Sequence, residues 1–226
     1  MHIAVGRHSL STCIAGCILI LVSQSGWTSN VTVEITYPGS DQSHLENAFV
    51  YLVPETPAPR RSASQQAALV QEDRQYHPYT QVVRVGDSVT FPNRDVVAHH
   101  VYSFSPARVF EIPLYTGEKN PPEVVFDKPG LVVLGCNIHD WMLAFILVID
   151  SPWFSPVKDN GAVIEEVPEG RYSLFFWYPS AETEAGVVRT IDLRDDLSVS
   201  IDLLDVPAIL NQPEAPRRKV GRREEY

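Results

Sequence analysis

Short apolar runs, many of them rich in valine, recur along the chain between clusters of Gly, Pro, Asn and Asp. Runs of this kind are typical of β-strands, and the periodicity of amphipathic helices is scarce. The pattern predicts strands at Val31 to Thr36, Ala48 to Val53, Thr80 to Val85, Ser88 to Phe91, His99 to Phe104, Glu123 to Phe126, Leu131 to Leu134, Leu143 to Ile149, Tyr172 to Trp177, Val187 to Leu193 and Leu197 to Leu203. Turns at Gly86-Asp87 and at Asp127 to Gly130 are predicted to join neighbouring strands as hairpins. This spacing favours an all-β chain with β-sandwich architecture.

Residues 1–26 are predicted to be a signal peptide for export to the periplasm. Arg7 precedes an apolar run from Leu10 to Val22, and small residues follow at Ser23 to Gly26. The run is too short to cross a bilayer comfortably, so no stable membrane span is expected in the mature chain. Ile14 to Cys17 is similar to a lipoprotein processing box, but apolar residues continue beyond Cys17, which makes lipid anchoring the weaker alternative.

Cys136 is the only cysteine outside the predicted signal peptide, so no disulfide can form within the mature chain. An unpaired cysteine in an oxidising compartment calls for an explanation. Cys136 begins the segment Cys136 to Met142, which also contains His139. The pair His99-His100 lies upstream of this segment. One thiolate, two imidazoles and a weak axial thioether form the ligand set of a blue-copper site. The alternative, that Cys136 and Met142 are ordinary buried residues, leaves the histidines unexplained.

The candidate loop lies between two strongly apolar predicted strands, Leu131 to Leu134 and Leu143 to Ile149. A ligand from another strand is then required. Adjacent side chains of a strand point to opposite faces, so only one of His99 and His100 can face the loop, and periodicity alone does not choose between them. A zinc site is less favoured, because a thioether is a poor fourth ligand for zinc.

The chain is acidic, with 18 basic and 28 acidic side chains and a net charge of −10. This balance disfavours nucleic acid as a partner. The acidic body can steer a positively charged redox partner or serve solubility alone, and both interpretations stay open. Residues 206–226, which include the basic positions Arg217 to Lys219, are predicted to be a disordered charged tail.

Residues 65–150 resemble the cupredoxins, most closely the amicyanin and plastocyanin group and the plastocyanin-like proteins labelled methylamine utilization proteins. The resemblance rests on the stretch from Gly86-Asp87 to His99 and on the Cys-x2-His-x2-Met spacing. It implies a Greek-key β-sandwich that holds one type 1 copper ion. The implied ligands are His99, Cys136, His139 and, in the axial position, Met142. His100 and Asp140 stand where these proteins commonly have Asn and Pro, so the reduction potential is not implied with the ligands.

Residues 31–60 and 151–205 are similar to the carboxypeptidase regulatory-like or transthyretin-like sandwich. The similarity rests on Leu45 to Leu52, Asp159 to Ile164 and Val167 to Leu174. It implies a second, small β-sandwich that is split in the sequence, with the cupredoxin domain inserted into it. An independent amino-terminal hairpin followed by a separate carboxy-terminal sandwich is the alternative.

The function that these features indicate is a periplasmic electron carrier that cycles between Cu(II) and Cu(I). Its partners would be redox proteins such as a c-type cytochrome or a periplasmic dehydrogenase. No enzymatic activity is expected, because four protein ligands leave no open position for a substrate. The alternative is a copper-binding accessory protein that serves copper delivery or the assembly of another enzyme.

Overall fold

Strands dominate the computed structural model, which describes residues 28–36, 42–56, 64–117, 119–180, 186–203 and 210–216. The predicted signal peptide, residues 1–26, lies outside the described residues. Within these ranges the only helical element is the short 3-10 helix η1 (Gln42–Asn47), and no helix there is long and apolar enough to cross a membrane. The all-β fold class expected from the sequence is confirmed.

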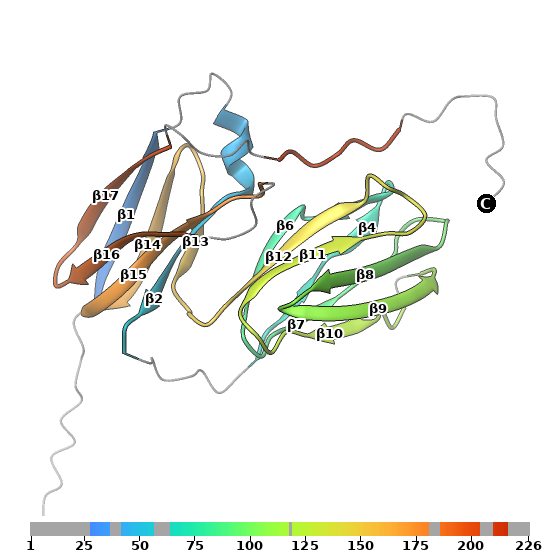
Figure 1. Ribbon diagram of the computed structural model, residues 1–226, viewed down its shortest axis with the longest axis horizontal. Coiled ribbons are helices and arrows are strands. Elements are labelled where there is room, and N and C mark those ends of the chain that lie inside the picture. Colours follow the sequence, from blue (N-terminus) through green and yellow to red (C-terminus); the bar gives the residue numbers. More distant parts are fainter. Residues whose placement is uncertain are drawn as a thin grey trace, which may run out of the picture.

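The strands between residues 66 and 149 form a sandwich of two main sheets (Figure 1). One sheet has the order β10 (Glu123–Val125), β7 (Ser88–Thr90), β3 (Gln66–Ala68). The other has the order β6 (Thr80–Arg84), β12 (Leu143–Ile149), β11 (Gly130–Gly135), β8 (His99–Ser105), β9 (Arg108–Tyr115). A small hairpin of β4 (Val70–Glu72) and β5 (Gln75–His77) accompanies them. The buried core of this sandwich includes Phe91, Phe126 and Ile146, and also Cys136 and Met142.

The flanking strands pair with one another and form a second sandwich. One of its sheets has the order β14 (Gly161–Pro168), β1 (Thr28–Thr36), β17 (Leu197–Asp202), and the other β13 (Phe154–Pro156), β2 (Phe49–Pro54), β15 (Gly170–Trp177), β16 (Gly186–Leu193). Segments from both ends of the sequence thus share one buried core, which includes Val33, Leu52 and Leu174.

A third buried cluster joins the two sandwiches. Strand β12 shows why: its residues Ala144, Ile146 and Val148 belong to the core of the first sandwich. The alternate residues Phe145, Leu147 and Ile149 pack instead with Tyr51 of β2 and Trp177 of β15. Because successive side chains of a strand point to opposite faces, β12 is buried on both sides, which explains its uninterrupted apolar sequence.

Several strands escaped the sequence prediction. These are β3, β4, β5, β9, β13 and β14. Four of them have only three residues each, too few to show a periodic pattern. Strand β9 lies at a sheet edge, where exposed and partly buried residues alternate and no apolar run is needed.

The hairpins predicted at two turns are wrong. Gly86-Asp87 lies between β6 and β7, and residues 126–129 connect β10 to β11. In both cases the two strands belong to different sheets. The two connections bond to each other instead. The Gly86 N–H donates to the Phe126 carbonyl (2.7 Å), and the Phe126 N–H donates to the Asp87 carbonyl (2.9 Å). These turns are therefore corners of the sandwich.

The structure also differs from the prediction of a disordered tail over residues 210–216. Leu210 packs against the third cluster, and its N–H donates to the Pro179 carbonyl (2.7 Å). Gln212 Nε2 donates to the Tyr76 carbonyl (2.7 Å). Apolar contact and hydrogen bonds hold this segment, and composition alone could not show these partners. Residues 204–209 and 217–226 lie outside the described residues.

Candidate metal centre

Three strands of the five-stranded sheet begin or finish at the same end of the sheet. Strand β8 begins with His99, β11 ends immediately before Cys136, and β12 begins immediately after Met142. Strand β11 is antiparallel to both β8 and β12, so the last residue of β11 and the first residues of its two neighbours lie at the same end of the sheet. The regular sheet thus brings His99 close to the loop that holds Cys136 and His139.

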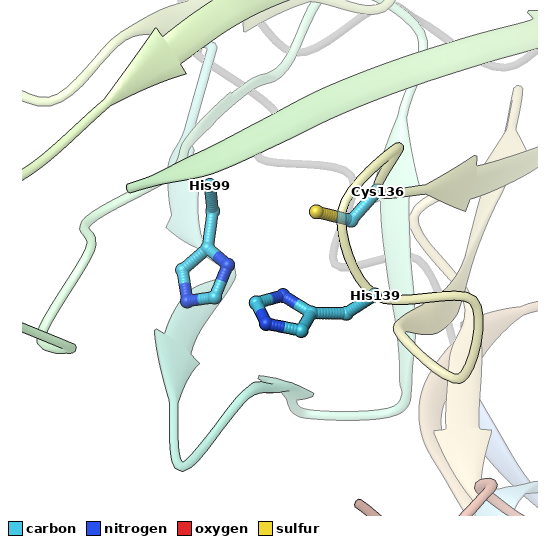
Figure 2. A group of neighbouring side chains, drawn as sticks. All are labelled: His99, Cys136 and His139. Carbon is cyan, nitrogen blue, oxygen red and sulfur yellow. The ribbon is translucent and has the colours of Figure 1, made fainter. Parts of the chain in front are cut away.

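His99, Cys136 and His139 form a compact cluster at this end of the sheet. One imidazole nitrogen of each histidine and the Cys136 Sγ all lie within 4.8 Å of one another. Figure 2 shows the sulfur and the two rings turned toward a shared space. His99 is fully buried and Cys136 is 3% exposed, whereas His139 is half-buried. The cluster is therefore most accessible from the side of His139.

His100 points away from this cluster. Its Nε2 lies 2.9 Å from Glu111 Oε1, and its ring packs near Tyr102 with a centroid distance of 5.6 Å. The alternation of strand side chains allowed either histidine to face the loop. The structure places His99 there.

Met142 ends the loop and is 2% exposed. It belongs to the same buried core as Cys136. Its backbone N–H donates to the His139 carbonyl (2.9 Å), which fixes the tight turn between the two residues. All four residues singled out in the sequence therefore lie at the same end of the sheet. Three of them form the cluster, and Met142 lies in the adjoining core.

Asp95 is a further residue of the site that the sequence did not reveal. Its Oδ2 lies 2.7 Å from His99 Nε2. The same carboxylate accepts hydrogen bonds from the backbone N–H groups of Asp73 and Arg74, both at 2.9 Å. Asp95 lies in the irregular segment before β8, where no periodicity predicts which way a side chain points. A carboxylate four residues before a candidate ligand was the only available signal.

Asn93 braces that irregular segment. Its side chain is buried, its Oδ1 accepts from the Asp95 N–H (2.9 Å), and its Nδ2 donates to the carbonyls of Val97 (3.0 Å) and Tyr115 (2.9 Å). The bond to Tyr115 of β9 shows that Asn93 also ties the segment to the sheet.

The donor atoms suit a metal ion in this position. His99 Nδ1 is buried and makes no hydrogen bond, while Nε2 is held by Asp95. With its proton on Nε2, the imidazole keeps the Nδ1 lone pair available, which is the usual arrangement of a metal-bound histidine with a carboxylate partner. One sulfur and two imidazoles fit copper better than a hard cation.

The local charges favour the metal-binding form of the thiol. Burial alone would raise the pKa of Cys136, but His99 and the backbone N–H groups of His100, Ile138 and His139 lower it below the ordinary thiol value. Burial alone would lower the pKa of His99, but Cys136 and Asp95 raise it above the ordinary histidine value. Burial alone would raise the pKa of Asp95, but His99 and hydrogen bonds from the backbone N–H groups of Arg74 and Asp73 lower it below the ordinary carboxyl value.

Trp141 packs beside His139, on the more exposed side of the cluster. Its ring centroid lies 5.1 Å from that of His139, and its Nε1 donates to the Arg74 carbonyl (3.0 Å). The residue is partly buried and packs against the core of the first sandwich. Trp141 therefore both flanks the candidate site and fills part of the core.

Comparisons with known proteins found similar solved structures. No family model matches the chain, and no curated protein matches it. A purple cupredoxin from Nitrosopumilus maritimus is 24% identical, with a TM-score of 0.32, over 36% of this chain and 98% of that chain. A mutant of amicyanin in its reduced Cu(I) form is 20% identical, with a TM-score of 0.34, over 43% of this chain and 98% of that chain. A copper-containing nitrite reductase from Thermus scotoductus SA-01 is 21% identical, with a TM-score of 0.37, over 44% of this chain but only 26% of that chain.

We expect the affinity for Cu(II) to increase with pH through the pKa of His99, because the metal ion must displace the proton of a protonated ring. Since that pKa is raised, proton competition should extend to higher pH than for an ordinary histidine. Competition titrations with a chromophoric chelator at a series of pH values measure this dependence. Asp95→Asn removes a carboxylate that raises the pKa, so the increase should occur at lower pH in that variant. An affinity that does not vary with pH in this range would contradict the prediction.

Proposed function

We propose that this chain is a type 1 copper protein that transfers single electrons between redox partners. The observation that carries the proposal is the convergence of the Cys136 sulfur and one ring nitrogen of each histidine, all within 4.8 Å of one another, at one end of a β-sheet. A thiolate with two imidazoles is the equatorial ligand set of blue-copper sites. Copper would supply a one-electron Cu(II)/Cu(I) couple there.

The four ligands and Asp95 have distinct tasks in this proposal. Cys136 binds as the thiolate, and His99 and His139 bind through ring nitrogens. Met142 is the weak axial ligand from the adjoining core. Asp95 holds the His99 ring in one orientation and one tautomer, because it accepts a hydrogen bond from the Nε2–H group. Rigid placement of this kind limits the rearrangement that accompanies each electron.

We propose that the chain itself catalyses no reaction. Four protein ligands leave no position open for a substrate, unlike catalytic metal sites, which keep one open. Electrons would enter and leave on the side of His139, the most accessible ligand of the cluster. Val96 is 99% exposed and Ile138 is 37% exposed, and each lies close in the chain to one ligand. Exposed apolar side chains near the ligands suit brief contact with a redox protein, such as a c-type cytochrome or a periplasmic dehydrogenase.

The domain organisation supports a role outside the cytoplasm. We propose that residues 1–26 direct export to the periplasm, that residues 65–150 are a cupredoxin domain, and that residues 31–60 and 151–205 are a split carboxypeptidase regulatory-like sandwich. The pairing of β1 with β17 and of β2 with β15 supports the split. A thiolate bound to copper also accounts for one unpaired cysteine in an oxidising compartment.

Electron transfer and copper delivery give different results in one experiment. The copper-loaded chain is mixed with a reduced c-type cytochrome, and separately with a metal-free copper acceptor. We expect rapid and reversible oxidation of the cytochrome and no loss of copper to the acceptor. Cys136→Ser is the control, and it should not oxidise the cytochrome. Copper transfer to the acceptor, with slow electron exchange, would instead support the delivery role.

A further inference from the structure

The carboxy-terminal segment 210–216, here called the strap, passes from the flanking sandwich onto the first sandwich (Figure 1). It starts at Leu210, whose N–H donates to the Pro179 carbonyl. From there the strap follows β5. Tyr79 Oη donates to the Asn211 carbonyl (3.3 Å), and Gln75 Nε2 donates to the Pro213 carbonyl (2.8 Å). Gln212 Nε2 bonds in the opposite direction, to the Tyr76 carbonyl.

The strap reaches the turn between β4 and β5. Arg74 Nη2 donates to the Pro216 carbonyl (3.3 Å). Asp73 and Arg74 form the two-residue turn, and both have positive φ (53° and 59°), as a type I′ hairpin requires. An isolated two-stranded hairpin is marginally stable in water at best, and here each strand has only three residues. The strap therefore supplies tertiary contacts that such a hairpin needs.

The same turn contacts both candidate histidine ligands through one intermediary each. Its backbone N–H groups bond to Asp95, which holds His99 Nε2. Its Arg74 carbonyl accepts the Trp141 Nε1–H, and the Trp141 ring packs against His139. A displacement of this turn would change the support of two ligands at once.

We propose that the strap is a positioning element of the metal centre. It anchors the β4–β5 turn, and the turn in turn keeps Asp95 against His99 and Trp141 against His139. The inference builds on the proposed copper site, but the contacts that it invokes exist without metal. It also gives the flanking sandwich a role, because the strap begins at that sandwich and ends at the β4–β5 turn, which supports the centre.

Two truncations test the strap. One removes residues 210–226, and the matched control removes only residues 217–226. In the copper-free chain, we expect the first truncation to speed hydrogen exchange of the Trp141 indole N–H at least about tenfold, because the turn can then open without first displacing the strap. In the copper-loaded chain, we expect the visible band to shift and the affinity to fall by about 10- to 100-fold, the usual effect of losing support around a ligand. The control should match the intact chain in both measurements.

Point substitutions decide the matter if the longer truncation does not fold. Gln75→Ala combined with Gln212→Ala removes two of the bonds that hold the strap. Gln66→Ala is the matched control, because its side chain bonds to Glu123 within the β10–β7–β3 sheet and does not contact the strap. We expect faster indole exchange in the double variant alone. Unchanged exchange in the double variant, or equal effects of the two truncations, would overturn the proposal. Failure to bind copper would overturn the proposed function, while the exchange data on the copper-free chain would still decide on the strap.

Discussion

Cys136→Ser is expected to abolish the intense visible absorption of the copper-loaded chain. That band arises from charge transfer between a thiolate and Cu(II), and a serine hydroxyl offers neither the sulfur orbitals nor the acidity for it. Among the described residues Cys136 is the only cysteine, and Met142 in the adjoining core is a thioether, which cannot form a thiolate. Absorption spectra of the two proteins at equal copper content measure the effect.

The serine variant also controls for the fold. A hydroxyl in place of a buried thiol should lower the free energy of unfolding of the copper-free chain by no more than about 1–3 kcal/mol, the usual range for a buried hydroxyl. Thermal unfolding of both copper-free proteins checks this. A variant that stays folded and keeps the full band would show that the thiolate is not the source of the colour, and the proposed centre would be wrong.

The second large effect is expected from two adjacent substitutions, His99→Ala and His100→Ala. His99→Ala should lower the affinity for copper by more than about 100-fold, because the loss of even an outer partner costs roughly 10- to 100-fold. His100→Ala should change it less than about tenfold, since His100 bonds to Glu111 on the opposite face of β8. Chelator competition and the spectrum of bound Cu(II) measure both.

The pair is well matched, because both histidines are buried and each bonds to a carboxylate. A general effect of losing a buried imidazole would therefore appear in both variants. Only a role as a metal ligand distinguishes them. Equal losses of affinity would contradict the assignment of His99, and a larger loss in His100→Ala would reverse it.

The sequence revealed those parts of the site that depend on local spacing or on regular strands. Cys136, His139 and Met142 lie in one short loop, so their proximity follows from the chain itself. The alternation of β8 restricted the remaining imidazole to one of two neighbours, and the resemblance chose His99. The structure adds the geometry that brings His99 to this loop, through the pairing of β8 with β11.

The parts that the sequence did not reveal depend on tertiary contacts between irregular segments. Asp95 and Arg74 meet because a loop before β8 packs on a two-residue turn more than 20 residues away. The strap escaped prediction for the same reason, since its polar and proline-rich composition resembles that of a disordered tail. The false hairpins have a related origin, because a turn sequence does not specify whether the next strand joins the same sheet or the facing one.

The double burial of β12 limits how this molecule can be divided for study. A fragment cut to residues 65–150 would leave Phe145, Leu147 and Ile149 facing water, together with Tyr79. A contiguous row of such side chains invites self-association in solution. Excising the first sandwich as a separate fragment is thus a poor route to a well-behaved sample, and heating the intact protein should melt both sandwiches together.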